Sequence, residues 1–160
     1  MKEGRLLAVF VVAVAVSAVA SGPLVGAVDL TRAEPTPGEG TAAVTVESVP
    51  TTEVVLERGE FDAGRYHLTA PPAVVDVGAV EGNPMLRYTI DVPGLWFTAS
   101  SRYELGGRDD DRLRLQPSPV GISPQTVDGD RYNATVSIWL RTGDLQTDLV
   151  QHRITVRVER

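Results

Sequence analysis

The chain has 160 residues with no cysteine, two histidines and a formal net charge of −6. Without cysteine there is no disulfide framework, no cysteine-ligated zinc, no iron–sulfur cluster and no thiol nucleophile. The acidic balance disfavours a nucleic-acid partner, because a negative protein repels phosphate unless it concentrates basic side chains on one face.

An apolar segment opens the chain: after a slightly basic start, residues 6–28 carry no charge and are rich in Val, Ala and Leu. A helix needs about 20 residues to cross the hydrocarbon core, so this segment is long enough to span a membrane. It equally fits a secretory signal peptide, with residues 18–20 as the small-residue cleavage site. We expect residues 1–28 to be either a cleaved signal peptide or a retained transmembrane anchor, with the rest of the chain outside the cell membrane.

Residues 29–42 are predicted to be a flexible linker, since two prolines and two glycines fall within residues 34–40. The remaining residues, 43–160, are enough for one folded domain. Three of its segments alternate apolar and polar side chains, as antiparallel strands do when one face lies on a core and the other in water. They are residues 86–92, 132–140 and 150–158.

Shorter segments add further strand candidates to this domain. They are residues 43–49, 53–57, 65–69, 74–80, 95–103 and 113–115. The breaks between them are rich in Gly, Pro and Asp, which is typical of turns. Eight or nine short strands at this spacing predict an all-β sandwich or barrel.

Residues 128–134 (DGDRYNA) resemble the tyrosine corner that enters the sixth strand of immunoglobulin domains, with Asp128 four residues before Tyr132. Ala134 stands where antibody domains have their second cysteine, so the inter-sheet disulfide is absent. Trp96 is the candidate for the central core tryptophan of such a domain. The resemblance implies an immunoglobulin-like antiparallel β-sandwich preceded by one N-terminal hydrophobic helix.

Residues 86–97 (LRYTIDVPGLWF), the linker and the apolar N-terminus resemble small, uncharacterised exported or membrane-anchored β-domain proteins of halophilic archaea. Lys2 is the only lysine beside 14 arginines. An acidic surface of this kind keeps a protein hydrated in high salt, although a GC-rich genome also replaces lysine by arginine. No assigned activity comes with this resemblance, so it implies no functional residue.

Motifs for nucleophilic catalysis are absent: the sequence has no Gly-x-Ser-x-Gly and no Ser-x-x-Lys. His152 is expected as a hydrogen-bonded core residue on the apolar face of the last strand, and His67 as a solvated residue on a polar face. Asp109, Asp110 and Asp111 are candidate calcium ligands, against the alternative of a solvated hairpin loop. We predict no catalytic residue, no cofactor and no resident metal.

Asn133 begins an N-glycosylation sequon on the polar face of its predicted strand, which makes it a candidate glycosylation site. Trp139 is predicted on the same face, either as a contact surface or covered by a second sheet or loop. Charges at alternate positions in residues 153–160 suit an edge strand that must not pair with neighbours.

These features favour a non-enzymatic envelope protein, with a β-sandwich that binds a partner or serves a structural role outside the membrane. Its expected partners are the membrane, through the N-terminal helix, and an envelope protein, with no nucleic acid. Two alternatives stay open: an accessory subunit of a membrane transport or secretion assembly, and a small exported hydrolase or calcium-dependent module.

Overall fold

Ten strands and two short 3-10 turns make up the described part of the chain, residues 36–60 and 63–160, in a computed structural model. The strands are β1 (Glu39–Ser48), β2 (Val55–Arg58), β3 (Tyr66–Thr69), β4 (Ala73–Asn83), β5 (Met85–Val92), β6 (Phe97–Glu104), β7 (Asp111–Leu115), β8 (Gly121–Ile122), β9 (Arg131–Thr142) and β10 (Leu145–Glu159), and the turns are η1 (Pro93–Leu95) and η2 (Pro124–Thr126). The predicted signal peptide or anchor, residues 1–28, lies outside the described residues. In the described ranges, no helix has the length and apolar character needed to cross a bilayer.

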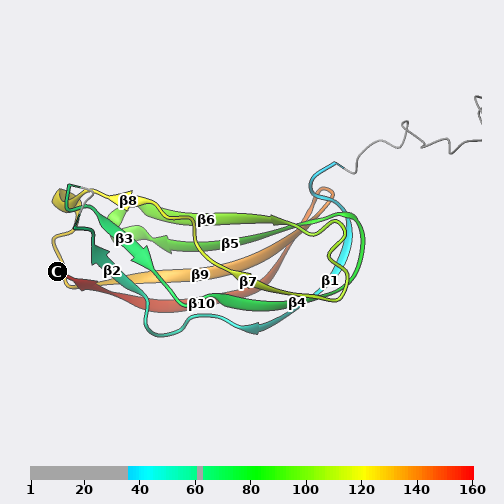
Figure 1. Cartoon of the computed structure of the whole chain (residues 1–160), viewed down its shortest axis with the longest axis horizontal. Helices are drawn as coiled ribbons and strands as arrows, with labels where there is room; N and C mark the ends of the chain where they lie inside the picture. The colour runs from blue at the N-terminus through cyan, green and yellow to red at the C-terminus, as the bar shows by residue number, and fades with distance from the viewer. Residues whose placement is uncertain (1–35, 61–62) are drawn as a thin grey trace, which may run out of the picture. The chain divides into compact units, whose positions relative to one another are not determined.

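The strands form two sheets, which confirms the all-β prediction. A three-stranded sheet has the order β1-β4-β7, and a seven-stranded sheet has the order β6-β5-β9-β10-β2-β3-β8. Neighbouring strands are antiparallel except β10 and β2, which run parallel. Figure 1 shows β5, β9 and β10 running along the middle of the domain, with β2, β3 and β8 gathered at one end and β1 at the other.

The apolar residues that alternate with polar ones in the sequence are the residues that are buried in β5 and β9. In β5 the side chains of Leu86, Tyr88 and Ile90 are fully buried, whereas the residues between them are half-buried. In β9 the buried set begins at Ala134 and recurs at every second residue to Leu140. These two strands pair directly, so their inward faces form a continuous apolar surface. Burying each large apolar side chain stabilises the fold by about 1.5–3 kcal/mol.

The first strand begins at Glu39, inside the segment predicted as linker up to residue 42. Two glycines explain the earlier start, since Gly40 and Gly82 lie opposite each other where β1 pairs with β4. A Cβ atom on Gly40 would lie 2.0 Å from the carbonyl oxygen of Glu81, and its φ is +113°. The glycine that suggested a flexible linker instead permits a close contact between two strands.

The end of the last strand is not a sheet edge, so the edge prediction was wrong for residues 157–159, where β10 pairs with β2. From residue 145 to residue 156, β10 pairs with β9 alone. The alternate charges lie on the outer face of the strand, because successive side chains point to opposite faces. β8 has two residues and was not predicted.

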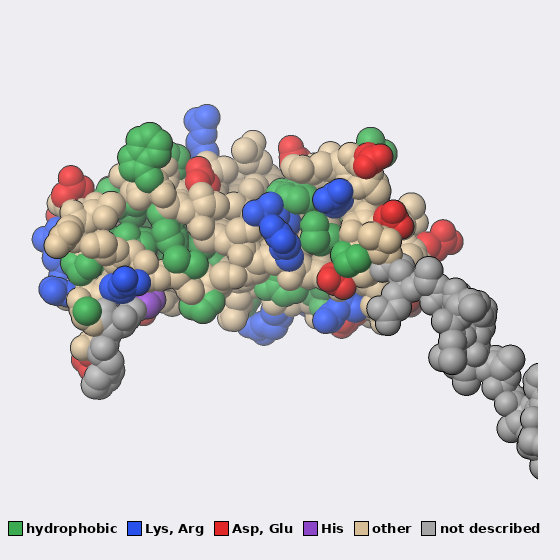
Figure 2. Space-filling model, turned by 90° about the horizontal axis from the view of Figure 1, so that it is seen from above, with side chains coloured by type: hydrophobic (Ala, Val, Ile, Leu, Met, Phe, Trp, Pro, Cys, Tyr) green, Lys and Arg blue, Asp and Glu red, His purple; other side chains and the backbone are tan. Residues whose placement is uncertain are grey.

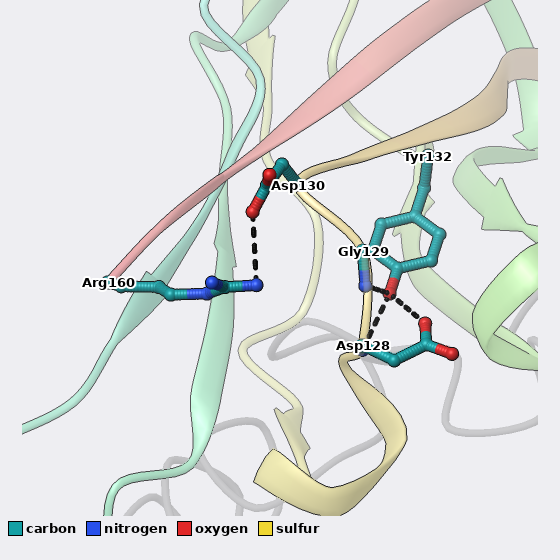
Figure 3. Close-up of polar contacts among 5 residues, drawn as sticks. All are labelled: Asp128, Gly129, Asp130, Tyr132 and Arg160. Carbon is teal, nitrogen blue, oxygen red and sulfur yellow. Dashed lines mark hydrogen bonds and ion pairs between the residues drawn. The ribbon is translucent and has the colours of Figure 1, made fainter.

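Hydrogen bonds join Tyr132 at the start of β9 to the preceding turn (Figure 3). The Tyr132 hydroxyl accepts from the backbone N–H of Asp128 at 2.9 Å and of Gly129 at 2.7 Å. It donates to Oδ1 of Asp128 at 2.8 Å. Asp130 in the same turn forms an ion pair with Arg160 at 3.0 Å, which holds the C-terminal residue against the turn.

Candidate functional site

Two of the three consecutive aspartates have different partners: Asp109 in the loop before β7, and Asp111 at the start of β7. Asp109 Oδ1 accepts a hydrogen bond from the backbone N–H of Val80 at 2.8 Å, and Asp111 pairs with Arg108 at 3.2 Å. Across the described residues, no three His, Asp or Glu side chains converge as a metal-ligand group. The loop uses Asp109 to connect β4 with the turn before β7.

A second charged cluster lies on the three-stranded sheet, where each strand supplies one side chain. Arg112 of β7 pairs with Glu47 of β1 and lies 3.9 Å from Asp76 of β4. A side-chain hydrogen bond with Asp76 and partial desolvation raise the pKa of Glu47, while the Arg112 charge opposes them. Two carboxylates share one guanidinium group in this cluster, which links the three strands of the sheet.

One of the two histidines, His152, does not lie in the environment expected for it. His67 is half-buried on β3, whereas His152 on β10 is exposed, and its prediction as a core residue was wrong. In the register His152 lies opposite the buried Val136. Residues 151–153 are nevertheless all exposed, which means that both faces of β10 are open to solvent at this point.

Neither of the two tryptophans is a fully buried core residue. Trp96 follows η1 and is 97% exposed, so it is not the core tryptophan that the immunoglobulin resemblance implied. Trp139 is half-buried on the outer face of β9, with the Arg87 guanidinium 5.4 Å from its ring centroid. Figure 2 shows apolar side chains scattered over the face in view, one of them standing clear of the surface.

Three arginines without an ion-pair partner among the described residues gather on the outer face of β9 and β10. Register places Arg131 directly opposite Arg157, and Thr155 opposite Asn133. Arg153 is four residues before Arg157 on the same strand face, about 13 Å away at 3.2–3.4 Å per residue. We call the surface formed by Arg131, Arg153 and Arg157 with the polar residues between them the arginine groove.

Two adjoining hollows form this groove. The larger, about 680 Å³, lies against the three arginines and residues 51–53. The smaller, about 320 Å³, is bounded by Pro93 of η1 and Thr135 of β9. Both hollows are lined by Asn133 and Arg153, so they meet along the β9–β10 pair. Asn133, the predicted sequon residue, is exposed in the middle of the groove.

The arginines of the groove have no ion-pair partner among the described residues. Glu53 is the one carboxylate lining the larger hollow. Asp91 on β5 lies opposite Thr135 of β9, which in turn lies opposite Arg153 of β10. The Asp91 carboxylate accepts a 2.6 Å hydrogen bond from the Thr98 hydroxyl. Three guanidinium groups against one carboxylate make the groove locally basic on a chain of net charge −6.

Such an arrangement is suited to binding anions. A guanidinium group presents a fixed fork of N–H donors that matches carboxylate, phosphate and sulfate oxygens. Asn133 and Thr155, which lie between the arginines, add neutral donors and acceptors. Sequence reasoning missed this site because Arg131 is 22 residues from Arg153, and the β9–β10 register alone brings them onto one surface.

A scan against protein-family models found no match for the chain, and a search of curated proteins found no similar sequence.

Proposed function

We propose that this protein is a non-enzymatic binding module of the cell envelope, exported and tethered outside the membrane by its N-terminal segment. Its folded part is an immunoglobulin-like β-sandwich, and its binding surface is the arginine groove. One observation carries the binding role: three arginines without a carboxylate partner among the described residues share one sheet face of an acidic protein. Around Arg112, in contrast, two carboxylates lie close to one guanidinium group.

The immunoglobulin-like assignment is supported by the tyrosine corner and by the two mainly antiparallel sheets. Two features differ from antibody domains. The position of the second cysteine is Ala134, which is buried, and Trp96 is exposed rather than central.

Within the domain, the groove lies at the end opposite to Gly38. Gly38 donates to the carbonyl oxygen of Asn83, at the end of β4, and Gly143 in the β9–β10 turn donates to Gly38. Arg131 begins β9 at the opposite end of that strand, about 35 Å away for 12 residues at 3.2–3.4 Å each. Figure 1 shows β1 and the C-terminus at opposite ends of the domain. A tethered module of this design presents its groove away from the attachment point.

The test has two parts. Protease treatment of intact cells that express the full chain should digest the domain, and the mass of the protected N-terminal fragment shows whether the tether is retained. The full chain in nanodiscs of neutral lipid should then bind immobilised polyglutamate, a simple polyanion, with a strength that falls as salt rises. Intracellular protection of the domain would overturn the envelope role, and failure to bind polyglutamate would overturn anion binding.

Paired charge variants localise the binding. Arg153→Gln with Arg157→Gln removes two groove charges and should weaken polyglutamate binding by about tenfold, since hydrogen bonds to charged groups contribute about 1.5–3 kcal/mol each before solvent screening. Arg102→Gln with Arg114→Gln removes the same charge from exposed positions on β6 and β7 and should change binding less than about twofold. Equal losses in both pairs would show that net charge, rather than the groove, governs binding.

A further inference from the structure

We infer that the ligand of the arginine groove is an acidic polysaccharide, whose sugar rings are recognised by Trp96 and whose carboxylate or sulfate groups are recognised by the arginines. This inference rests on the proposed function, because it names the ligand class of the same groove. Its evidence is the position and conformation of Trp96, which the arginines alone do not explain.

Trp96 is held in a conformation that costs stability. Its φ of 48° and ψ of 39° lie in the left-handed region, which residues other than Gly, Asn and Asp rarely adopt. Its side chain is 97% exposed, so burial of the ring does not offset the strain. A glycine would satisfy the backbone here at lower cost. A large aromatic side chain at a strained, solvent-exposed position is characteristic of a contact surface.

The strained residue adjoins the groove. The backbone N–H of Trp96 donates to the carbonyl oxygen of Pro93 at 3.0 Å, and Pro93 lines the smaller hollow together with Asn133, Thr135 and Arg153. Leu95, between them, is buried and holds η1 in the core. The turn η1 therefore places the backbone of Trp96 next to Pro93, which borders a hollow that contains guanidinium, amide and hydroxyl groups, and leaves the indole ring exposed.

These three kinds of group match the parts of an acidic sugar chain. An aromatic ring is an amphipathic platform with an apolar face for the C–H face of a sugar ring. Thr and Asn side chains pair with hydroxyl groups, and arginines pair with acidic groups in a bidentate manner. Arg153 and Arg157 are about 13 Å apart, so one extended ligand reaches both when it carries several acidic groups.

The surface fits this ligand better than a lipid headgroup or a nucleic acid. Gly38, just before β1, lies at the end of the domain opposite to Arg131, so a tether that precedes it would join the domain away from the groove and η1. A nucleic acid is disfavoured by the net charge of −6, which repels a long phosphate chain outside the groove.

The experiment compares five ligands with the full chain in nanodiscs of neutral lipid. Polygalacturonate has sugar rings and carboxylates, polyglutamate has carboxylates without sugar rings, and dextran has sugar rings without charge. Phosphatidylglycerol vesicles and single-stranded oligo(dT) represent the two excluded classes. We expect polygalacturonate to bind about fivefold more tightly than each of the others, because an aromatic contact adds to the ion pairs.

Two variants test the role of the ring. Trp96→Ala should weaken polygalacturonate binding by about fivefold and leave polyglutamate binding unchanged, because only the sugar uses the indole. Leu145→Ala is the matched control, since Leu145 is 71% exposed at the far end of the β9–β10 hairpin, and it should change neither.

The outcomes separate this inference from the proposed function. Equal binding of polyglutamate and polygalacturonate, with no effect of Trp96→Ala, would overturn the polysaccharide assignment and leave an anion-binding module. Preference for the vesicles or for oligo(dT) would overturn it in favour of that class. Loss of binding to every anionic ligand would overturn both conclusions.

Discussion

Two tyrosines of the domain allow the same chemical change to be made in opposite environments. The Tyr132 hydroxyl takes part in three hydrogen bonds, two from backbone N–H groups and one to the Asp128 carboxylate. The Tyr88 hydroxyl is fully buried and has no hydrogen-bond partner within the described residues. Burial, with a smaller effect of Tyr103, raises the pKa of Tyr88 well above its usual range. Tyr132→Phe and Tyr88→Phe each remove one hydroxyl group and nothing else.

The two variants should move stability in opposite directions. A neutral hydrogen bond contributes about 0.5–1.5 kcal/mol net and one to a charged group about 1.5–3 kcal/mol. The Tyr132 contacts are partly exposed and share one oxygen, so we expect Tyr132→Phe to lower the free energy of unfolding by about 2 kcal/mol. An unpaired buried polar group costs about 1–3 kcal/mol, so Tyr88→Phe should be neutral or raise the free energy by about 1 kcal/mol.

Urea unfolding of the full chain, followed by near-UV circular dichroism, measures both changes under one condition. Equal m-values across the three proteins show that the same surface is exposed on unfolding, and the midpoints then report stability. A Tyr132→Phe change below about 0.5 kcal/mol would refute the structural role of the tyrosine corner. A loss in Tyr88→Phe as large as that in Tyr132→Phe would show that the Tyr88 hydroxyl has a partner.

Four further outcomes follow from the described contacts. The pKa of Glu47, followed by NMR, should lie above 4.5. Protonated Glu47 then stabilises the fold below that pH, and this stabilisation is lost as the pH rises through the folded-state pKa. Asp76→Asn should lower the pKa of Glu47, and an unchanged pKa would contradict the hydrogen bond between Glu47 and Asp76. Trp96→Gly should raise the free energy of unfolding by about 0.5–1 kcal/mol in urea titrations, because it relieves left-handed strain; a loss would contradict that strain. Gly40→Ala should lower it by about 2 kcal/mol, since the added Cβ meets the Glu81 carbonyl, and a neutral result would mean that β1 can shift. Peptide mapping of protein from its native cells should find Asn133 unmodified, because a glycan there would fill the arginine groove and block it.

The fold class was predictable from the sequence because strand periodicity is a local property. The alternation around Leu86 and Val136 placed both on the inner faces that the structure shows. Predictions failed where position depends on more distant partners. Trp96 has the large apolar side chain that is typical of core residues, but in the turn η1 the buried residue is its neighbour Leu95. His152 follows the inner register of β10, yet both faces of the strand are open there.

The arginine groove could not be predicted, because its residues come from two strands and their meeting depends on register. The sequence shows the charges of Arg153 and Arg157, but their alternation is equally typical of an edge strand that must not pair with its neighbours. A one-residue slip of β10 would turn both to the opposite face. The Asp128–Tyr132 contact, in contrast, spans four residues and was predicted from a short local pattern.

NMR of the arginine Nε–Hε groups, recorded for the full chain in detergent micelles during titration with polygalacturonate, tests the binding surface most directly. We predict that the signals of Arg131, Arg153 and Arg157 shift together and saturate at one ligand concentration, while those of Arg102 and Arg114 stay in place. Saturating shifts at Arg102 and Arg114 with none at the three groove arginines would contradict the site assigned here.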